Sequence, residues 1–167
     1  MKEKWVEQLI EDVYPSMLLY GLSLTRSHYE AEDLVQEALY RFLLIYDQLE
    51  DTNYKAWLFR VMRNYYFDKQ RKGKNKVSLL HKLQPFYQEK TDDLLHRFIQ
   101  LKEHEQLYQA IAHLKEPYQE ILVSYYFLDM SIKNIADITG LKLSNVKVLL
   151  HRGRKQLKEV LSNEKLS

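Results

Sequence analysis

Apolar residues recur along the chain at the three- and four-residue spacing of amphipathic helices. The first such pattern runs from about Lys4 to Leu24, and Pro15 is expected to bend this helix or to lie near a helix start. Ser27 and Glu30 then have the S-x-x-E spacing of a capping box, in which two side chains satisfy unpaired amides at a helix start. We therefore expect a second helix there, with a core stripe of Ala31, Leu34, Val35, Ala38, Phe42 and Ile45.

A polar stretch from Asp47 to Asn53 interrupts the pattern, and Thr52 or Asn53 is expected to cap the helix that follows. That third helix should run from Tyr54 to about Arg71, with a buried face of Trp57, Leu58, Val61 and Tyr65. Gly73 should end it, because glycine commonly closes helices.

The break after Gly73 divides the chain. It predicts an N-terminal domain over residues 1–73, a linker of low periodicity over 74–93 and a C-terminal domain over 94–167. With four Gly and three Pro in 167 residues, the composition favours helices over a turn-rich β fold. The expected fold class is all-α, in two small helical domains.

The C-terminal domain should begin with a helix from about Leu94 to Leu114. Pro117 suits the first turn of another helix, from Tyr118 to Leu128. These two helices precede the segment with the clearest functional pattern.

That segment, SIKNIADITGLKLSNVKVLLHRGRKQL from Ser131 to Leu157, has the pattern of a helix-turn-helix. Ser131 should cap a short helix to Ile138, and Gly140 allows the backbone angle of the turn. Ser144 should cap a last helix to about Leu161. On that helix, one apolar face is formed by Val146, Leu149, Leu150, Gly153 and Leu157.

The opposite face of the last helix is basic and suits a DNA major groove. Lys147 and Arg152 can donate to guanine edges or phosphate, and Val148 can contact a thymine methyl group. Arg154 is expected to hold the DNA backbone. The candidate DNA-binding residues are Ser144, Asn145, Lys147, Val148, His151, Arg152, Arg154 and Lys155. The alternative is an ordinary solvated basic helix.

Charge supports a second nucleic-acid surface, although the net charge is only +2. Most basic residues lie in two stretches, Tyr54–Lys76 and Ser131–Lys158, and each stretch contains a single acid. In the first stretch, arginines are interleaved with an aromatic residue on one helix face, which suits unpaired DNA because bases stack on aromatic rings. The candidate residues are Asn53, Tyr54, Lys55, Arg60, Arg63, Asn64, Phe67 and Arg71. Alternatively, Phe67 packs on the linker; for Trp57 we favour a core role.

The helix after Ser27 carries an acidic face with apolar members, a combination typical of protein docking. The candidate docking residues are Glu30, Asp33, Gln36, Glu37, Tyr40 and Arg41. A solvated charged face is the alternative, and a metal site is not expected because no histidine or further carboxylate converges there.

Several classes of protein are not supported by the sequence. There is no cysteine, which excludes disulfides and cysteine zinc sites. No H-E-x-x-H, G-x-S-x-G or phosphate-binding glycine loop appears, so neither catalysis nor a cofactor is expected. Glu7, Glu11 and Asp12 interrupt the amphipathic N-terminus, and no apolar run is long enough to cross a bilayer. We expect a soluble cytoplasmic protein without membrane insertion.

Three blocks in order resemble sigma factors of the extracytoplasmic-function (ECF) type. They are YEAEDLVQEA at 29–38, AWLFRVMRN at 56–64 with Asp68 and Arg71, and the helix-turn-helix. The A-E-D-L-V-Q-E run is highly specific, and the similarity covers nearly the whole chain apart from the linker and the extreme ends.

The resemblance implies a transcription initiation factor that directs bacterial core RNA polymerase to promoter DNA without a cofactor of its own. It implies that Asp33, Gln36 and Glu37 dock on the clamp helices of the largest polymerase subunit, and that the flap of the second subunit is also contacted. The Asp47–Asn53 loop and the Tyr54–Arg71 helix would capture and open the −10 element, with a base flipped into a loop pocket. The last helix would read the −35 element, and the linker would thread towards the RNA exit channel.

The family resemblance also implies an inhibitory partner, an anti-sigma factor that covers both domains. Exposed apolar residues and the linker agree with this expectation. The main rival function is a free-standing helix-turn-helix regulator, usually a symmetric dimer, which leaves the first domain unexplained. A third class is a helical nucleic-acid enzyme or an RNA-binding protein. The basic patches are the only feature of the sequence that favours this class.

Overall fold

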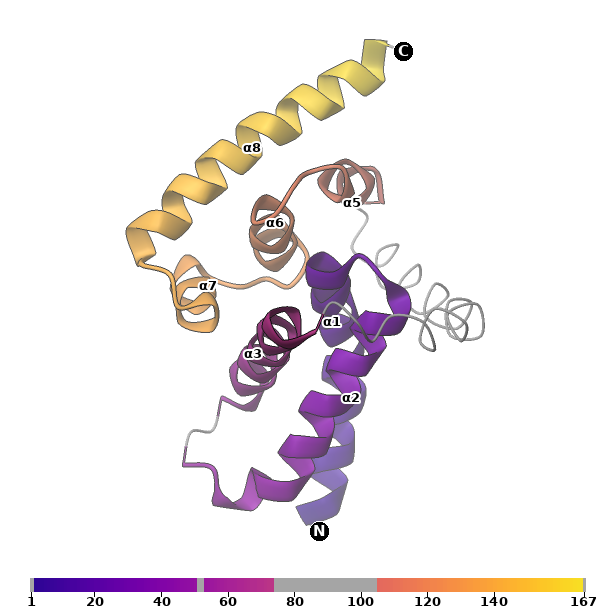
Figure 1. Ribbon diagram of the computed structural model, residues 1–167, viewed down its shortest axis with the longest axis vertical. Helices are drawn as coiled ribbons and strands as arrows, with labels where there is room; N and C mark the ends of the chain where they lie inside the picture. Colours follow the sequence, from indigo (N-terminus) through magenta and orange to yellow (C-terminus); the bar gives the residue numbers. More distant parts are fainter. Residues whose placement is uncertain (1, 51–52, 74–104, 167) are drawn as a thin grey trace. The chain divides into compact units, whose positions relative to one another are not determined.

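A computed structural model describes residues 2–50, 53–73 and 105–166, and within these ranges every regular element is a helix (Figure 1). The expected all-α fold class is thus confirmed. The chain divides into two compact units, Met1–Leu95 and His96–Ser167. The expected linker 74–93, Thr52 and residues 94–104 of the expected Leu94–Leu114 helix lie outside the described residues.

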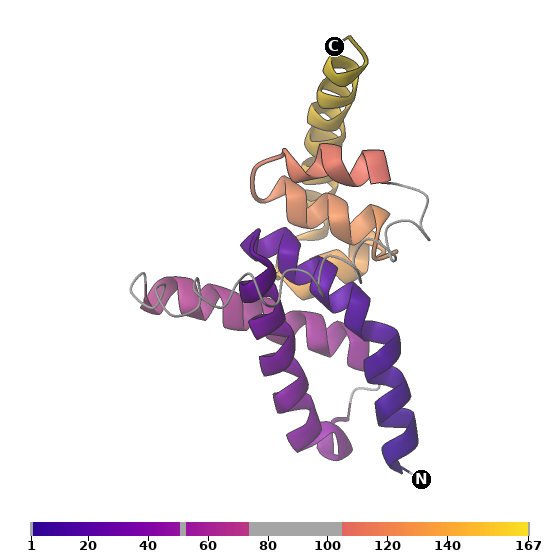
Figure 2. The same cartoon turned by 90° about the vertical axis from the view of Figure 1, so that its right-hand side faces the viewer.

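The first unit contains α1 (Lys2–Thr25), α2 (His28–Ile45), the short 3₁₀ helix η1 (Tyr46–Gln48) and α3 (Tyr54–Lys72). Helix α1 packs along α2, and α3 contacts both (Figures 1 and 2). Pro15 lies inside a continuous α1, so the alternative that it marks a helix start is wrong. Fully buried side chains from all three helices form the core, and burying each one contributes roughly 1.5–3 kcal/mol. They include Met17, Leu18, Leu19, Tyr20, Leu34, Phe42, Leu58, Phe59 and Met62.

The start of α2 differs in one contact from the expected capping box. The Ser27 hydroxyl accepts a hydrogen bond from the Glu30 amide at 3.3 Å, as expected. The Ser27 amide, however, donates to Thr25 Oγ1 at 3.2 Å and not to the Glu30 carboxylate. The Thr25 side chain, two residues before Ser27, therefore satisfies this amide.

The buried residues of α2 and α3 differ in part from the predicted core stripes. Ala31, Leu34, Val35, Ala38 and Phe42 are buried as expected, but Ile45 is exposed because it ends α2.

On α3, only Leu58 of the expected buried face is buried; Trp57, Val61 and Tyr65 are half-buried. Phe59 and Met62 are buried instead, and the Phe59 ring meets Tyr20 of α1 edge to face at 5.1 Å. Because α3 packs against two helices, its buried face is rotated relative to the expected stripe.

The second unit contains α5 (Glu105–Ala112), α6 (Tyr118–Tyr126), α7 (Ile132–Thr139) and α8 (Leu143–Leu166). Helix α6 ends two residues before the expected Leu128. Ser131 caps α7 by accepting from the Asn134 amide at 3.0 Å, as expected. Helix α8 contacts α5, α6 and α7, and its C-terminal part extends past them (Figure 2).

The turn between α7 and α8 depends on Gly140, whose φ of +75° lies in the left-handed region that only glycine adopts without strain. The Gly140 amide donates to the Ala136 carbonyl at 2.9 Å and closes α7. Helix α8 begins at Leu143, and the Val146 amide donates to the Lys142 carbonyl at 3.1 Å. Ser144 therefore lies in the first turn of α8, and its expected capping role is wrong.

Candidate functional site

Helices α7 and α8 form a helix-turn-helix with a closely packed inner side. Val146, Leu150, Gly153 and Leu157 of α8 are buried, and Leu149 is half-buried. A Cβ atom on Gly153 would lie 3.2 Å from Leu122 Cδ1 of α6, so α8 approaches α6 closely at this point. This packing fixes which side of α8 faces outward.

The outward side of α8 exposes all eight candidate DNA-binding residues: Ser144, Asn145, Lys147, Val148, His151, Arg152, Arg154 and Lys155. Val148 is 44% exposed, and Leu143, which is not among the predicted DNA-binding residues, is 45% exposed. An apolar group set among cations and amides on one face has the chemistry for reading base edges and thymine methyl groups.

Arg154 differs from the other exposed cations because two tyrosines of α6 hold it. Its Nε donates to the Tyr126 hydroxyl at 2.9 Å, and its guanidinium lies over the Tyr125 ring, 5.0 Å from the centroid. The hydrogen bond that Arg154 donates to the Tyr126 hydroxyl raises the pKa of Arg154 further above its ordinary value. The sequence predicts that Arg154 holds the DNA backbone, whereas this contact between helices depends on how α6 packs against α8.

The basic face of α3 contains an open hollow lined by Arg63, Asn64, Phe67, Gln70 and Arg71. The Arg63 guanidinium lies over the Phe67 ring, 4.5 Å from its centroid. Tyr66 meets the same ring edge to face at 5.1 Å. Phe67 is therefore half-buried among residues of its own helix, and Arg71 forms an ion pair with Asp68. Four of the expected single-strand-binding residues thus share one surface.

The other expected residues of this surface lie at the start of α3 or on its flank. Asn53 caps the helix by accepting from the Ala56 amide at 3.2 Å, and both Asn53 and Lys55 are exposed, whereas Arg60 is half-buried.

Tyr54 belongs to an aromatic cluster that periodicity did not reveal. Trp5 of α1 stacks on Tyr54 with centroids 5.3 Å apart and meets Tyr46 edge to face at 5.7 Å. Phe42 contacts Tyr46, Tyr54 and Trp57. One tryptophan therefore touches residues on both sides of the polar stretch between α2 and α3.

The acidic face of α2 is tied to α3. Asp33 Oδ2 accepts a hydrogen bond from Lys69 Nζ at 2.7 Å. Burial lowers the pKa of Lys69, but the hydrogen bond and charge of Asp33 outweigh this and raise it. Glu37 binds Arg41 Nε at 3.0 Å on the same face.

The ring of Tyr65 contacts the cations of both pairs. Arg41 is 5.3 Å and Lys69 5.2 Å from its centroid. Burial, followed by the charge of Asp33, raises the pKa of the Tyr65 hydroxyl. Tyr65 and Lys69 were not among the expected docking residues, and their contribution depends on how α3 crosses α2.

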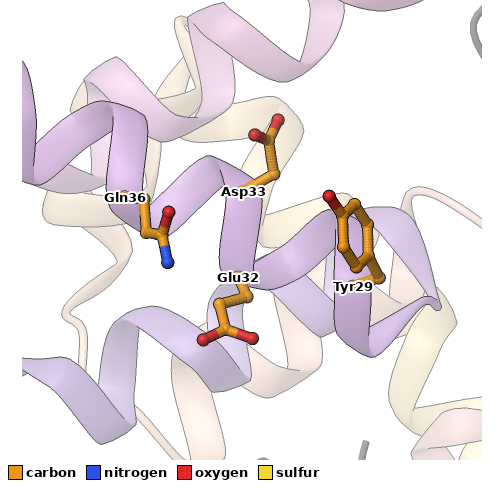
Figure 3. Close-up of a pocket in the computed structure, with 4 residues that line it drawn as sticks. All are labelled: Tyr29, Glu32, Asp33 and Gln36. Atoms are coloured by element: carbon orange, nitrogen blue, oxygen red, sulfur yellow. The ribbon is translucent and has the colours of Figure 1, made fainter. Parts of the chain in front are cut away.

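A small polar pocket adjoins this face, lined by Tyr29, Glu32, Asp33 and Gln36 (Figure 3). Figure 3 shows the Glu32 and Asp33 carboxylates pointing away from each other, so they do not converge as metal ligands. Among the described residues there is no group of three or more metal-ligating side chains.

Large apolar side chains continue the acidic face towards the end of α2. Tyr40 is 61% exposed, Leu43 51% and Leu44 60%. Gln36 and Arg41 are exposed, whereas Glu30, Asp33 and Glu37 are half-buried. Within the part of the chain that the structure describes, no helix is long and apolar enough to span a membrane.

Two family models match the chain. Sigma-70 region 2 matches residues 9–76, and Sigma-70 region 4 matches residues 104–157. The chain is 30% identical over 153 residues to the ECF RNA polymerase sigma factor SigM of Bacillus subtilis, covering 91% of this chain and 90% of SigM. It is 28% identical to SigW of the same organism, covering 80% of this chain and 76% of SigW.

A solved structure has the same fold. It is the sigma factor RpoE of Bartonella quintana, in complex with the anti-sigma factor NepR. The TM-score is 0.65 and the identity 24%, with 93% of this chain and 96% of the other covered.

Proposed function

The chain belongs to the ECF family of sigma factors, and on that premise we propose that it binds core RNA polymerase and directs it to specific promoters. The observation that carries the proposal is the presence of two kinds of surface on one chain. An acidic and apolar face on α2 suits a protein partner, whereas basic faces on α3 and α8 suit DNA. Polymerase performs the chemistry, and this chain positions the DNA.

Polymerase docking is assigned to Glu30, Asp33, Gln36, Glu37, Tyr40 and Arg41. Only one Asp33 oxygen is used by Lys69, so the other can accept a hydrogen bond from a cationic group of the clamp helices. Exposed Tyr40, Leu43 and Leu44 add apolar area that a partner would cover. The flap of the second subunit is a further proposed contact.

Promoter reading is divided between the two domains, 1–73 and 94–167, joined by the linker 74–93. The hollow of α3 around Phe67 captures the unpaired −10 strand, because Arg63 and Arg71 can hold phosphates beside a ring on which a base stacks. The exposed face of α8 enters the major groove of the −35 element. Asn53, Tyr54, Lys55 and Arg60 extend the −10 surface at the start of α3.

We place the action of this protein in the cytoplasm, where polymerase transcribes. An anti-sigma factor is a further proposed partner. The RpoE structure is a complex with such a factor. The exposed apolar residues of α2 would attract a partner that competes with polymerase for the same face.

Transcription with purified core polymerase on genomic DNA tests the proposal. The parent protein should produce discrete transcript starts that share two upstream sequence elements, and Asp33→Arg should bind core polymerase at least tenfold more weakly. Glu11→Arg, an exposed acid-to-base change on α1 and off the α2 face, is the control. Absence of discrete starts, together with unimpaired core binding by Asp33→Arg, would refute the function.

A free-standing helix-turn-helix regulator makes the opposite prediction. It would bind specific duplex tightly without polymerase, usually as a symmetric dimer. Gel-shift measurements on the mapped promoters with and without core enzyme separate the two functions.

A further inference from the structure

Arg154 lies on the flank of the exposed face of α8, and its position is set by a different helix. Its Nε donates to the Tyr126 hydroxyl at 2.9 Å, and its guanidinium stacks over the Tyr125 ring. The two tyrosine rings meet edge to face with centroids 5.2 Å apart, so each supports the other. An exposed arginine normally samples many rotamers, and fixing one before binding removes an entropic cost of association.

The two groups that hold Arg154 are uncharged, and this determines what the arginine can do. Among the described residues, no carboxylate lies within ion-pair distance of Arg154. A carboxylate would have cancelled the positive charge, whereas a hydroxyl and an aromatic face orient it and leave the charge intact. The remaining N–H donors of the guanidinium suit the oxygens of a phosphate.

The neighbours of Arg154 on α8 point to the same ligand. His151 and Lys158 lie one helical turn before and after it, and Lys155 is adjacent. Holding a cation among other cations is unfavourable in the free protein and becomes favourable when a polyanion binds. When a helix lies in a major groove, residues at its centre reach bases and residues on its flank reach the backbone.

We propose that Arg154, Tyr125 and Tyr126 form a phosphate clamp on the DNA backbone beside the −35 element. Arg154 contacts the phosphate, while Tyr125 and Tyr126 act as positioning residues. The clamp is therefore built from α6 and α8 together, and it adds a residue pair outside the helix-turn-helix to promoter binding. This inference rests on the proposed function, in which α8 binds promoter duplex.

Binding of the full chain with core polymerase to a short promoter duplex that ends upstream of the −10 element tests the clamp. Tyr126→Phe removes one hydroxyl and should weaken binding about two- to tenfold. The loss should be equal on a duplex with a scrambled −35 element, because phosphate contacts carry no sequence information. Tyr118→Phe, the same change elsewhere on α6, is the matched control and should bind like the parent.

Two further measurements distinguish positioning from a structural role. Arg154→Ala should lower the slope of log affinity against log salt by about 0.9, as expected for one lost phosphate contact. In the Arg154→Ala background, Tyr126→Phe should have no further effect on affinity.

Other outcomes would overturn the clamp. If Tyr126→Phe lowered only the melting temperature, or if its loss of affinity persisted without Arg154, the tyrosine would not act through the arginine. If the parent holoenzyme did not prefer the promoter duplex over the scrambled one, the proposed function itself would fail. The two failures are therefore distinguishable.

Discussion

Asp33 on α2 accepts a hydrogen bond from Lys69 on α3, with 2.7 Å between Oδ2 and Nζ. This contact links the helix proposed to dock on polymerase with the helix proposed to capture DNA. Both side chains are more than a third exposed, so solvent screens the pair and its contribution to stability is roughly 1 kcal/mol or less. A cationic partner can therefore compete for Asp33 at little cost.

Removal of the Lys69 cation should strengthen the attraction between the acidic face of α2 and a basic partner. Lys69→Met leaves the charge of Asp33 uncompensated, so we expect core polymerase to associate about two- to fivefold faster at low salt, with the gain disappearing at high salt. Stopped-flow association kinetics would measure this. Lys72→Met removes the same charge three residues along the same helix and should have a smaller effect; equal effects would show that the pairing with Asp33 does not matter.

The same pair predicts a pH dependence of stability. The folded pKa of Lys69 is raised above the ordinary value of 10.5, despite burial, by the hydrogen bond and charge of Asp33. A raised folded pKa adds stability that is fully present below the unfolded pKa and is lost as pH rises through the folded pKa. The difference in unfolding free energy between the parent and Lys69→Met should thus be constant near neutral pH and shrink above about pH 10. A difference that already changed between pH 6 and 9 would contradict this assignment.

Gly153 should not accept a larger side chain. A Cβ atom there would lie 3.2 Å from Leu122 Cδ1, and Leu122 is fully buried. Gly153→Val is expected to lower the free energy of unfolding by about 1–3 kcal/mol through overpacking. Lys155→Val introduces the same residue at an exposed position of α8 and should cost about 0.5 kcal/mol, from helix propensity alone. Urea denaturation of the two variants would compare them, and equal losses would argue against the close α6–α8 approach.

Val148 should read a thymine methyl group in the −35 element. Its side chain is 44% exposed, so Val148→Ala should leave folding unchanged. Replacing the contacted thymine by uracil should weaken binding of the parent about fourfold, since one methyl group is worth roughly 0.8 kcal/mol. The alanine variant should be much less sensitive to that replacement. Equal sensitivity of both proteins at every position would exclude Val148 as the reader.

Trp5 should stabilise the polar stretch between α2 and α3 from both sides. It stacks on Tyr54 and meets Tyr46 edge to face, and each aromatic pair contributes about 0.5–1.5 kcal/mol. Trp5→Ala is expected to destabilise the protein by about 1–3 kcal/mol and to slow promoter opening, whereas Trp5→Phe should retain most of both properties. Thermal unfolding and permanganate reactivity of promoter thymines would measure the two effects. Normal opening by Trp5→Ala would show that the cluster serves the core alone.

The sequence by itself determined the helical nature of the described elements, the caps at Ser27 and Ser131, and the turn at Gly140. For α3 it left Thr52 and Asn53 as alternative caps, and the structure shows Asn53 in that role. These features depend on neighbours within a few residues, where side-chain and backbone chemistry dominates. The family motifs could also be identified from the sequence, because they are contiguous runs of residues. The outward face of α8 followed from helical periodicity once the helix was known.

Only the tertiary structure decided the contacts between helices. The Asp33–Lys69 pair, the hold of Tyr126 on Arg154 and the stacking of Trp5 on Tyr54 join residues far apart in the chain. Periodicity assigns residues to a face of one helix, but it does not say how two helices are rotated against each other. That rotation placed Phe59 and Met62 in the core in place of Trp57 and Tyr65, and it brought Lys69 to Asp33.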